Sequence, residues 1–166
     1  MIIRDETPAD VRAITEVTVA AFRTLPISGN TEHFVIRELR AAHALTLSLV
    51  AERDGRVVGH IAFSPVTISD GTTGWYGLGP VSVLPELHGQ GIGSALVREG
   101  LSRLKALGGK GCTLVGDPGY YRRFGFRNIP ELVLEDIPPE VFLALPFGNE
   151  IPQGTVLFHD AFLATS

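Results

Sequence analysis

The chain has 166 residues, 45% of them hydrophobic, which is enough for one globular domain with a buried core, and we expect a single domain over residues 1–166. The formal net charge of −4 offers no basic surface for a nucleic acid, and no run of about 18 apolar residues predicts a membrane-spanning helix. Cys112 is the only cysteine, which excludes an intramolecular disulfide and a zinc site built from cysteines. Because the N-terminus also lacks the pattern of a signal peptide, we expect a cytoplasmic protein with no membrane partner and no metal.

The pattern of apolar, capping and turn residues predicts an α+β fold. In chain order we expect a strand at 1–6, helices from Pro8 to before Pro26 and at 32–43, strands at 46–53, 56–68 and 75–84, a helix at 92–107, a strand at 112–115, a short helix at 119–124, and strands at 141–145 and 155–159. Asp54-Gly55 is typical of a type I′ hairpin turn. Gly77, Gly79 and Pro80 interrupt regular pairing of the third inner strand, as a bulge or a splayed strand would. The helix at 92–107 links two strands as a crossover, which makes the sheet mixed.

Three alternating glycines, Gly89, Gly91 and Gly93, stand between a β-branched strand and that helix. Glycines let an anion approach the backbone, and they adopt the positive φ values that turn successive N–H groups toward one point. The helix adds its unpaired N–H groups and the positive end of its dipole at the same place. The stretch therefore predicts a site for a phosphate or pyrophosphate.

The glycines alone leave the ligand open. A P-loop requires Gly-Lys-Ser/Thr, and no lysine follows Gly93, so a nucleotide-hydrolysing loop is not expected. A dinucleotide loop has the pattern G-x-G-x-x-G in an early βαβ unit, whereas here the sixth position is Ser94 and an antiparallel meander comes first. Asp117 does lie roughly where a ribose-binding acid would stand, so this alternative stays open. The other open alternative is that the glycines only allow a tight turn and bind no ligand.

A second block, Gly116–Phe126, narrows the choice. With it the sequence resembles the GNAT acetyltransferase superfamily over nearly the whole chain, and most closely its YhbS-like N-acetyltransferases. The signature Gln/Arg-x-x-Gly-x-Gly/Ala is matched by His88-Gly89-Gln90-Gly91-Ile92-Gly93, and Tyr-x-x-x-Gly-Phe by Tyr121-Arg122-Arg123-Phe124-Gly125-Phe126. The resemblance implies a GNAT-like fold with a mixed central sheet, an N-terminal antiparallel meander, splayed middle strands and about four flanking helices.

The resemblance also implies how acetyl-coenzyme A (acetyl-CoA) is bound. Backbone N–H groups of the glycine loop would bind its pyrophosphate, and main-chain groups of Val81 and Val83 would meet the pantetheine arm and the thioester. The residues assigned to the coenzyme are Val81, Val83, His88, Gly89, Gln90, Gly91, Ile92, Gly93 and Ser94. His88 stands where Gln or Arg is usual, so its side-chain contact with the phosphate is left open.

Tyr121 matches the tyrosine that commonly acts in this family as general acid toward the departing thiolate. A phenol with a pKa of about 10 can protonate or hydrogen-bond a thiolate whose thiol has a pKa of about 8.5. Packing of the ring against the short helix is the other explanation for Tyr121. We expect Tyr120 to pack or to line the acceptor pocket, and Asp117 to be a helix N-cap rather than a base. Three arginines are candidates for the 3′-phosphate or for a solvated surface: Arg98, Arg122 and Arg123.

The implied reaction is direct attack of a primary amine on the thioester, with a backbone N–H near Val83 stabilising the oxyanion. The strand at 75–84 has no carboxylate that could serve as base, although family members often have one there. The candidates elsewhere are Glu32, His33, Glu38, His60, Ser64 and His159. Aromatic residues that could form an apolar acceptor pocket, or simply belong to the core, are Phe22, Phe34, Trp75, Tyr76, Phe142 and Phe147.

The acceptor itself is left open between a small-molecule amine and a peptide N-terminus, as are the acyl-chain preference and whether the chain forms a homodimer. The alternative to an enzyme is a non-catalytic acyl-CoA-binding module that acts as a sensor or interaction partner.

Overall fold

The structure is a computed structural model of the chain, and it describes residues 1–25 and 28–166. In chain order its helices and strands are β1 (Ile2–Asp5), α1 (Val11–Arg23), α2 (Glu32–Ala41), β2 (Leu47–Arg53), β3 (Arg56–Pro65), β4 (Thr67–Ile68), β5 (Trp75–Val83), α3 (Ile92–Ala106), β6 (Gly111–Val115), α4 (Pro118–Tyr121), β7 (Leu132–Val133), β8 (Phe142–Pro146) and β9 (Gly154–Leu157). Among these residues six strands form one sheet in the order β1-β2-β3-β5-β6-β8, and β4, β9 and β7 form a smaller one.

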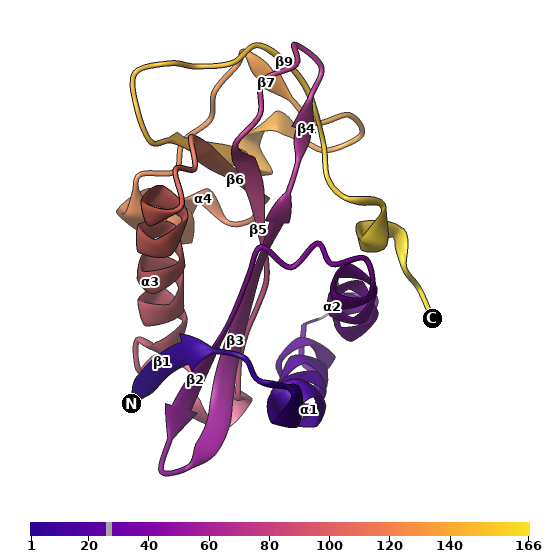
Figure 1. Cartoon of the computed structure of the whole chain (residues 1–166), viewed down its shortest axis with the longest axis vertical. Helices are drawn as coiled ribbons and strands as arrows, with labels where there is room; N and C mark the ends of the chain where they lie inside the picture. Colours follow the sequence, from indigo (N-terminus) through magenta and orange to yellow (C-terminus); the bar gives the residue numbers. More distant parts are fainter. Residues whose placement is uncertain (26–27) are drawn as a thin grey trace.

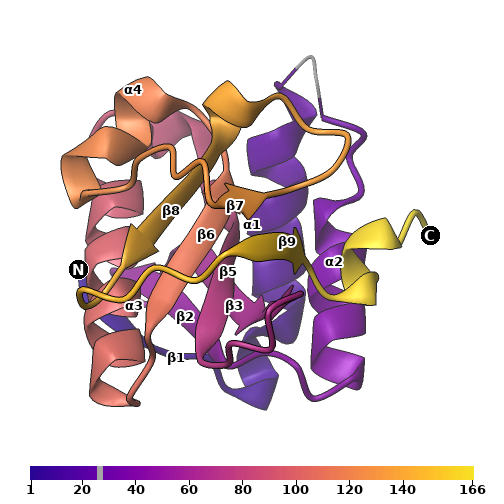
Figure 2. The ribbon, with the colours of Figure 1, turned by 90° about the horizontal axis from the view of Figure 1, so that it is seen from above.

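The helices cover the large sheet on two sides. Figures 1 and 2 show α1 and α2 on one face and α3 on the other, and both α1 and α3 contact β3. The smaller sheet lies at one end of the molecule, beyond β6 (Figure 1). The predicted α+β fold, with a mixed sheet and α-helices that number four in the described chain, is therefore confirmed.

The chain enters α1 through a capped turn, Pro8–Asp10, with Thr7 as its N-cap. The Asp10 carboxylate accepts hydrogen bonds from the Thr7 N–H at 2.7 Å and from the Thr7 hydroxyl at 3.1 Å. Arg4 on β1 pairs with the same carboxylate at 2.8 Å, and this hydrogen bond lowers the pKa of Asp10 well below its usual range. The first strand and the first helix are thus joined by a charged corner. α1 ends at Arg23, and Pro26, on which its predicted end depended, lies outside the described residues.

The antiparallel meander follows the prediction up to Pro65. Asp54 and Gly55 take φ values of 53° and 75°, as a type I′ turn requires. The single strand predicted at 56–68 is wrong, because β3 ends at Pro65 and β4 joins the smaller sheet beside β9. Proline has no N–H with which to extend a ladder, and the chain changes sheets directly after it.

β5 and β6 are parallel neighbours, as a crossover through α3 predicts, but they stay together only briefly. Their pairing covers Trp75–Gly77, and the β3–β5 register shifts in the next stretch, where the Gly79-Pro80 peptide bond is cis. Past Gly77, β5 continues beside β3 alone within the described chain, while β6 continues beside β8. The predicted splay of the middle strands is therefore present.

The end of the chain differs in detail from the prediction. β8 runs antiparallel to β6 at the edge of the large sheet, close to the predicted 141–145. β9 is shorter than the predicted 155–159 and lies between β4 and β7. β7, a strand of two residues, was not predicted, because so short a segment carries no periodicity.

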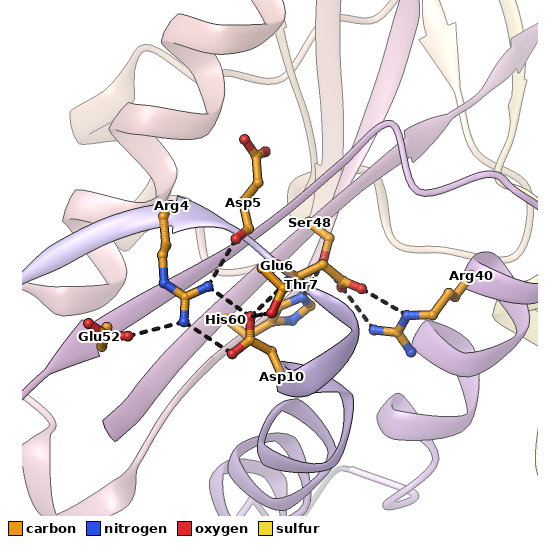
Figure 3. Close-up of polar contacts among 9 residues, drawn as sticks. All are labelled: Arg4, Asp5, Glu6, Thr7, Asp10, Arg40, Ser48, Glu52 and His60. Atoms are coloured by element: carbon orange, nitrogen blue, oxygen red, sulfur yellow. Dashed lines mark hydrogen bonds and ion pairs between the residues drawn. The ribbon is translucent and has the colours of Figure 1, made fainter. Parts of the chain in front are cut away.

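A polar network fastens α2 to the first three strands (Figure 3). Arg40 donates to both Glu6 oxygens, at 2.9 and 3.0 Å, and the Ser48 hydroxyl donates to Glu6. Because that hydroxyl has one proton, His60 Nε2 must donate to Ser48, across 2.8 Å. Burial alone would raise the pKa of Glu6, but the hydrogen bonds from Arg40 and Ser48 outweigh it and lower the pKa. His60 is fully buried, and burial lowers its pKa to about 4.

His60 should make the stability of the protein fall on mild acidification. Its folded pKa of about 4 lies below the unfolded value of about 6.5, so the unfolded chain takes up the proton first, and stability is lost as the pH falls through this window. We expect a loss on the order of 2 kcal/mol between pH 6.5 and 4.5, measured as the free energy of unfolding in urea. His60→Gln should remove most of this slope. Equal slopes in the two proteins would contradict the prediction.

Gly100 on α3 should resist substitution by alanine. A Cβ there would overlap the ring of Phe63, which is 0% exposed on β3 and cannot move away. Alanine favours a helix over glycine by about 1 kcal/mol, but overpacking a rigid core costs about 1–3 kcal/mol or more, so we expect Gly100→Ala to lower the melting temperature. Adding Phe63→Leu should recover part of the loss. A single variant more stable than the wild type would disprove the close packing.

Candidate active site

The departure of β5 from β6 leaves one edge of β5 open. The Leu84 N–H donates to the Val58 carbonyl at 3.0 Å, so main-chain groups at this position face β3. Because directions alternate along an antiparallel strand, the N–H and C=O groups of Val81 and Val83 face the other way, toward the space that β6 has left. The contact predicted between the main chain of these two residues and the pantetheine arm requires this orientation.

The side chain of His88 closes part of that edge. Its Nε2 lies 3.0 Å from the Val83 carbonyl oxygen, and since a carbonyl can only accept, this nitrogen carries a proton. The ring is thereby held against the end of β5. The sequence left a contact between His88 and phosphate open; the structure commits one ring nitrogen to the backbone.

The glycine loop faces open space. Gly89 and Gly91 have φ values of 81° and 83°, and a Cβ on either would meet no atom within 4 Å. A side chain at either position would therefore not collide with the rest of the chain. Glycine is favoured here because the backbone has positive φ values and because the absence of a side chain leaves the loop open to a ligand. The first bond inside α3 runs from the Ala95 N–H to the Gly91 carbonyl at 3.0 Å. The N–H groups of the preceding turn are left pointing out of the helix end, as an anion site requires.

A cleft of about 540 Å³ connects the loop with the open edge of β5. All residues predicted for the coenzyme line it except Gln90, whose side-chain oxygen instead accepts from Arg53 at 2.9 Å. The described residues that line the cleft include no carboxylate, whereas His88 and Arg123 contribute positive or polar groups. The cleft thus fits the phosphates of a coenzyme.

The cleft has further residues that the sequence did not assign to the coenzyme: Ala21, Phe22, Leu25, Leu87, Tyr120 and Arg123. Ala21, Leu25 and Leu87 were not candidates for any role, whereas Phe22 and Tyr120 were candidates for the acceptor pocket. Ala21 and Phe22 of α1 are far from the glycine loop in the sequence and come close to it only in the folded chain, so no local motif identifies them. Of the three arginines considered for the 3′-phosphate, Arg123 alone lines the cleft, with its guanidinium 4.4 Å from the centre of the Tyr120 ring. Arg98 instead covers the Phe124 ring at 4.9 Å.

A second cavity of about 510 Å³ adjoins the cleft and shares Phe22, Leu25 and Val81 with it. Its walls come from the end of α1, the start of α2, the irregular part of β5, the end of β6 and the C-terminal segment. Leu25 and Val115, which are 45% and 47% exposed, place apolar surface on its walls. The two hollows therefore meet at the open edge of β5.

Tyr121 and Tyr120 face different hollows. Tyr121 lines the second cavity, and its ring lies on Gly116, where a Cβ would come within 2.6 Å of the ring. Burial raises the pKa of Tyr121 to about 12, so its phenol stays protonated at neutral pH. Tyr120 packs edge-on against Tyr121, as expected, but it faces the cleft at Gly93 rather than the second cavity.

Of the predicted candidates for a general base, Glu32 is the one that lines either hollow. His60 and Ser64 are 0% exposed inside the fold. The others make local contacts: His33 stacks on Phe34, Glu38 pairs with Arg37, and His159 Nδ1 accepts from the Ala161 N–H. Asp117 accepts from the Gly119 N–H at 2.9 Å and is the N-cap of α4, as predicted.

The suggested set of aromatic residues does not assemble into one pocket. Phe22 lines the second cavity, but Trp75 and Phe142 belong to the core beneath the smaller sheet. Phe158 and Phe162 of the C-terminal segment take the place of the others. Gly77 provides room for Phe158, because a Cβ there would lie 2.6 Å from its ring.

In the described parts of the chain, no helix is long and apolar enough to cross a membrane. Within the same residues no three His, Cys, Asp or Glu side chains are arranged to hold a metal ion.

Comparisons with known proteins identify the family of the chain. Residues 44–128 match the family described as the acetyltransferase (GNAT) domain. The uncharacterized N-acetyltransferase YhbS of Escherichia coli K12 is 38% identical over 127 residues, which cover 76% of this chain and 73% of YhbS.

Two solved structures are similar over nearly the whole chain. A GNAT family acetyltransferase from Brucella melitensis in complex with acetyl-CoA has 53% identity, covers 97% of each chain and gives a TM-score of 0.87. YhbS from Escherichia coli in complex with CoA has 31% identity, with 99% of this chain and 93% of that one covered and a TM-score of 0.89.

These relationships confirm the prediction, made from the two motifs, of an N-acetyltransferase of the acetyl-CoA-dependent class. The chain belongs to the GNAT family of acetyltransferases.

Proposed function

We propose that the chain transfers the acetyl group of acetyl-CoA to a primary amine by direct attack, with both substrates bound at once. The observation that carries this proposal is that the cleft and the second cavity meet at Val81, on the open edge of β5. One hollow suits the donor and the other is left for the acceptor. The acetyl-CoA and CoA complexes of the Brucella and Escherichia coli relatives support the choice of donor.

The main chain does most of the binding in this proposal. The N–H groups at the start of α3 and in the glycine loop bind the pyrophosphate, while the outward-facing groups of Val81 and Val83 orient the pantetheine arm. Bound acetyl-CoA supplies an activated acetyl thioester. A main-chain N–H near Val83 stabilises the negative charge that develops on the thioester oxygen during attack, because it is fixed in place before the reaction begins.

Tyr121 assists the departing sulfur. Its pKa of about 12 lies above that of an ordinary thiol, about 8.5, so complete proton transfer from the phenol to the thiolate is unfavourable. A hydrogen bond from the phenol is favourable, because it stabilises the negative charge on sulfur within a partly buried site. Tyr121 thus acts as a hydrogen-bonding acid, and the proton that finally resides on the thiol comes from solvent or from the amine.

Gly91→Glu should abolish the binding of acetyl-CoA. The variant places a carboxylate and a strained backbone where the pyrophosphate is expected, and we expect an affinity loss of about 100-fold or more by calorimetry. Gly108→Glu is the matched control, since Gly108 has a φ of 87°, no atom within 4 Å of its Cβ position, and a place past the opposite end of α3. Undiminished affinity in Gly91→Glu, or equal loss in both variants, would refute the assignment of the loop.

Tyr121→Phe should lower kcat by about 100-fold and leave the affinity for acetyl-CoA within about threefold, because the lost hydroxyl acts on the leaving group. CoA release with a panel of amines measures this, and Tyr76→Phe, which removes the hydroxyl of a tyrosine that lines neither hollow, is the control. Since the phenol titrates near pH 12, the rate in the wild type should not fall from Tyr121 ionisation up to about pH 10. A Tyr121→Phe enzyme as fast as the wild type would exclude the role. Wild-type protein that binds acetyl-CoA but acetylates no amine would indicate a binding module instead.

A further inference from the structure

We propose that Glu32 binds the ammonium group of the acceptor in the second cavity and removes its proton, and that the acceptor is a primary amine on an apolar or aromatic body. This inference rests on the proposed function and deepens it, by naming a base and a class of acceptor.

The charge of the residues that line the cavity favours the binding of an ammonium group. Among the described residues that line it, Glu32 is the one with an acidic or basic side chain. The rest of the lining is mostly aliphatic and aromatic, and it includes Phe22, Val35, Phe158 and Phe162. A cationic amine that leaves water for such a wall needs a counter-charge, because an unpaired charge in an apolar site costs several kcal/mol. Glu32 is the group that provides it.

The position of the carboxylate is fixed by its neighbours. Glu32 is the first residue of α2, and the Ser28 hydroxyl lies 2.9 Å from each of its two oxygens. Ser28 in turn accepts from the Asn30 N–H at 3.0 Å, which orients the hydroxyl toward Glu32. A hydroxyl has one proton, so most of the acceptor capacity of the carboxylate remains available for an ammonium group.

A helix-stabilising acid is the competing explanation for Glu32, since carboxylates are favourable at helix N-termini. That role accounts for an acid in the first turn. It does not account for the apolar wall around it, nor for the position of Leu25 and Val115, 45% and 47% exposed, in the same cavity as the carboxylate. An amine with an apolar body matches both parts of the lining, because its ammonium group pairs with Glu32 and its body packs against the apolar residues.

The protons balance in the reaction that follows. The ammonium gives one proton to Glu32, directly or through water, and the nitrogen lone pair then forms a bond to the acetyl carbon. The carbon–sulfur bond breaks, and its electrons leave on sulfur under the hydrogen bond from Tyr121. The nitrogen loses a second proton as the amide forms. One of the two protons ends on the thiol and the other in solvent.

The test compares Glu32→Gln with wild-type protein, using acetyl-CoA and 2-phenylethylamine. At pH 7.5 we expect the variant to lose about tenfold or more in kcat/KM, chiefly through KM of the amine, with the affinity for acetyl-CoA unchanged. The loss should shrink toward pH 10, because an amine with a pKa of about 10 then reaches the enzyme without its proton. Glu38→Gln is the control, since Glu38 lies on the same helix but does not line the cavity. A loss that is equal at every pH, or no loss, would overturn the role of Glu32.

The proposed class of acceptor is tested separately, by comparing the rates of acetylation of different amines. We expect the wild type to prefer 2-phenylethylamine over ethanolamine, and both over L-aspartate, whose carboxylates Glu32 repels; Glu32→Gln should narrow the discrimination against aspartate. A wild-type preference for ethanolamine or aspartate would overturn the inference, while acetyl transfer itself would stand. A wild type that acetylates none of these amines, nor a peptide N-terminus, would overturn both.

Discussion

The separation of two parallel strands is the feature on which the rest of this structure depends. β5 and β6 pair over Trp75–Gly77 and then part, so a row of backbone N–H and C=O groups on β5 has no neighbouring strand among the described residues. Inside a protein such groups must find partners, because an unpaired buried amide is costly. His88 satisfies one carbonyl, and the remaining groups face the cleft. The sheet thus offers an extended ligand the same main-chain bonds that another strand would take.

The two hollows owe their shape to elements that keep α1 and α2 in place at this opening. Phe22 and Leu25 reach it from the end of α1, and Glu32 from the start of α2. The Arg4–Asp10 corner and the Glu6–Arg40–Ser48–His60 network fasten these helices to β1, β2 and β3 (Figure 3). These contacts anchor the start of α1 and the end of α2, whereas the hollows lie at the other ends of the two helices.

Local chemistry made much of the fold predictable. The type I′ turn, the N-cap of α4 and the positive φ values of the glycine loop all depend on residues close together in the chain, and each lies where the sequence places it. Features that depend on long-range contacts were harder to predict. The strand predicted at 56–68 breaks at Pro65, and Phe158 and Phe162 line the second cavity although neither was a candidate. Of the two explanations given for Trp75 and Phe142, the structure supports the core. An alternating apolar pattern shows that a side chain is buried, but it does not show against which partner.

The sequence by itself determined the family and the loop at which a phosphate site is expected. Positive φ values, a missing Cβ and a helix N-terminus are properties of consecutive residues, and they act through the backbone whatever surrounds them. Only the tertiary structure decided which tyrosine faces which hollow, that His88 bonds the backbone of β5, and that Glu32 alone among the candidate bases reaches a cavity. Those facts depend on where β6 leaves β5 and on how α1, α2 and the C-terminal segment close around the gap, which are contacts between residues far apart in the chain.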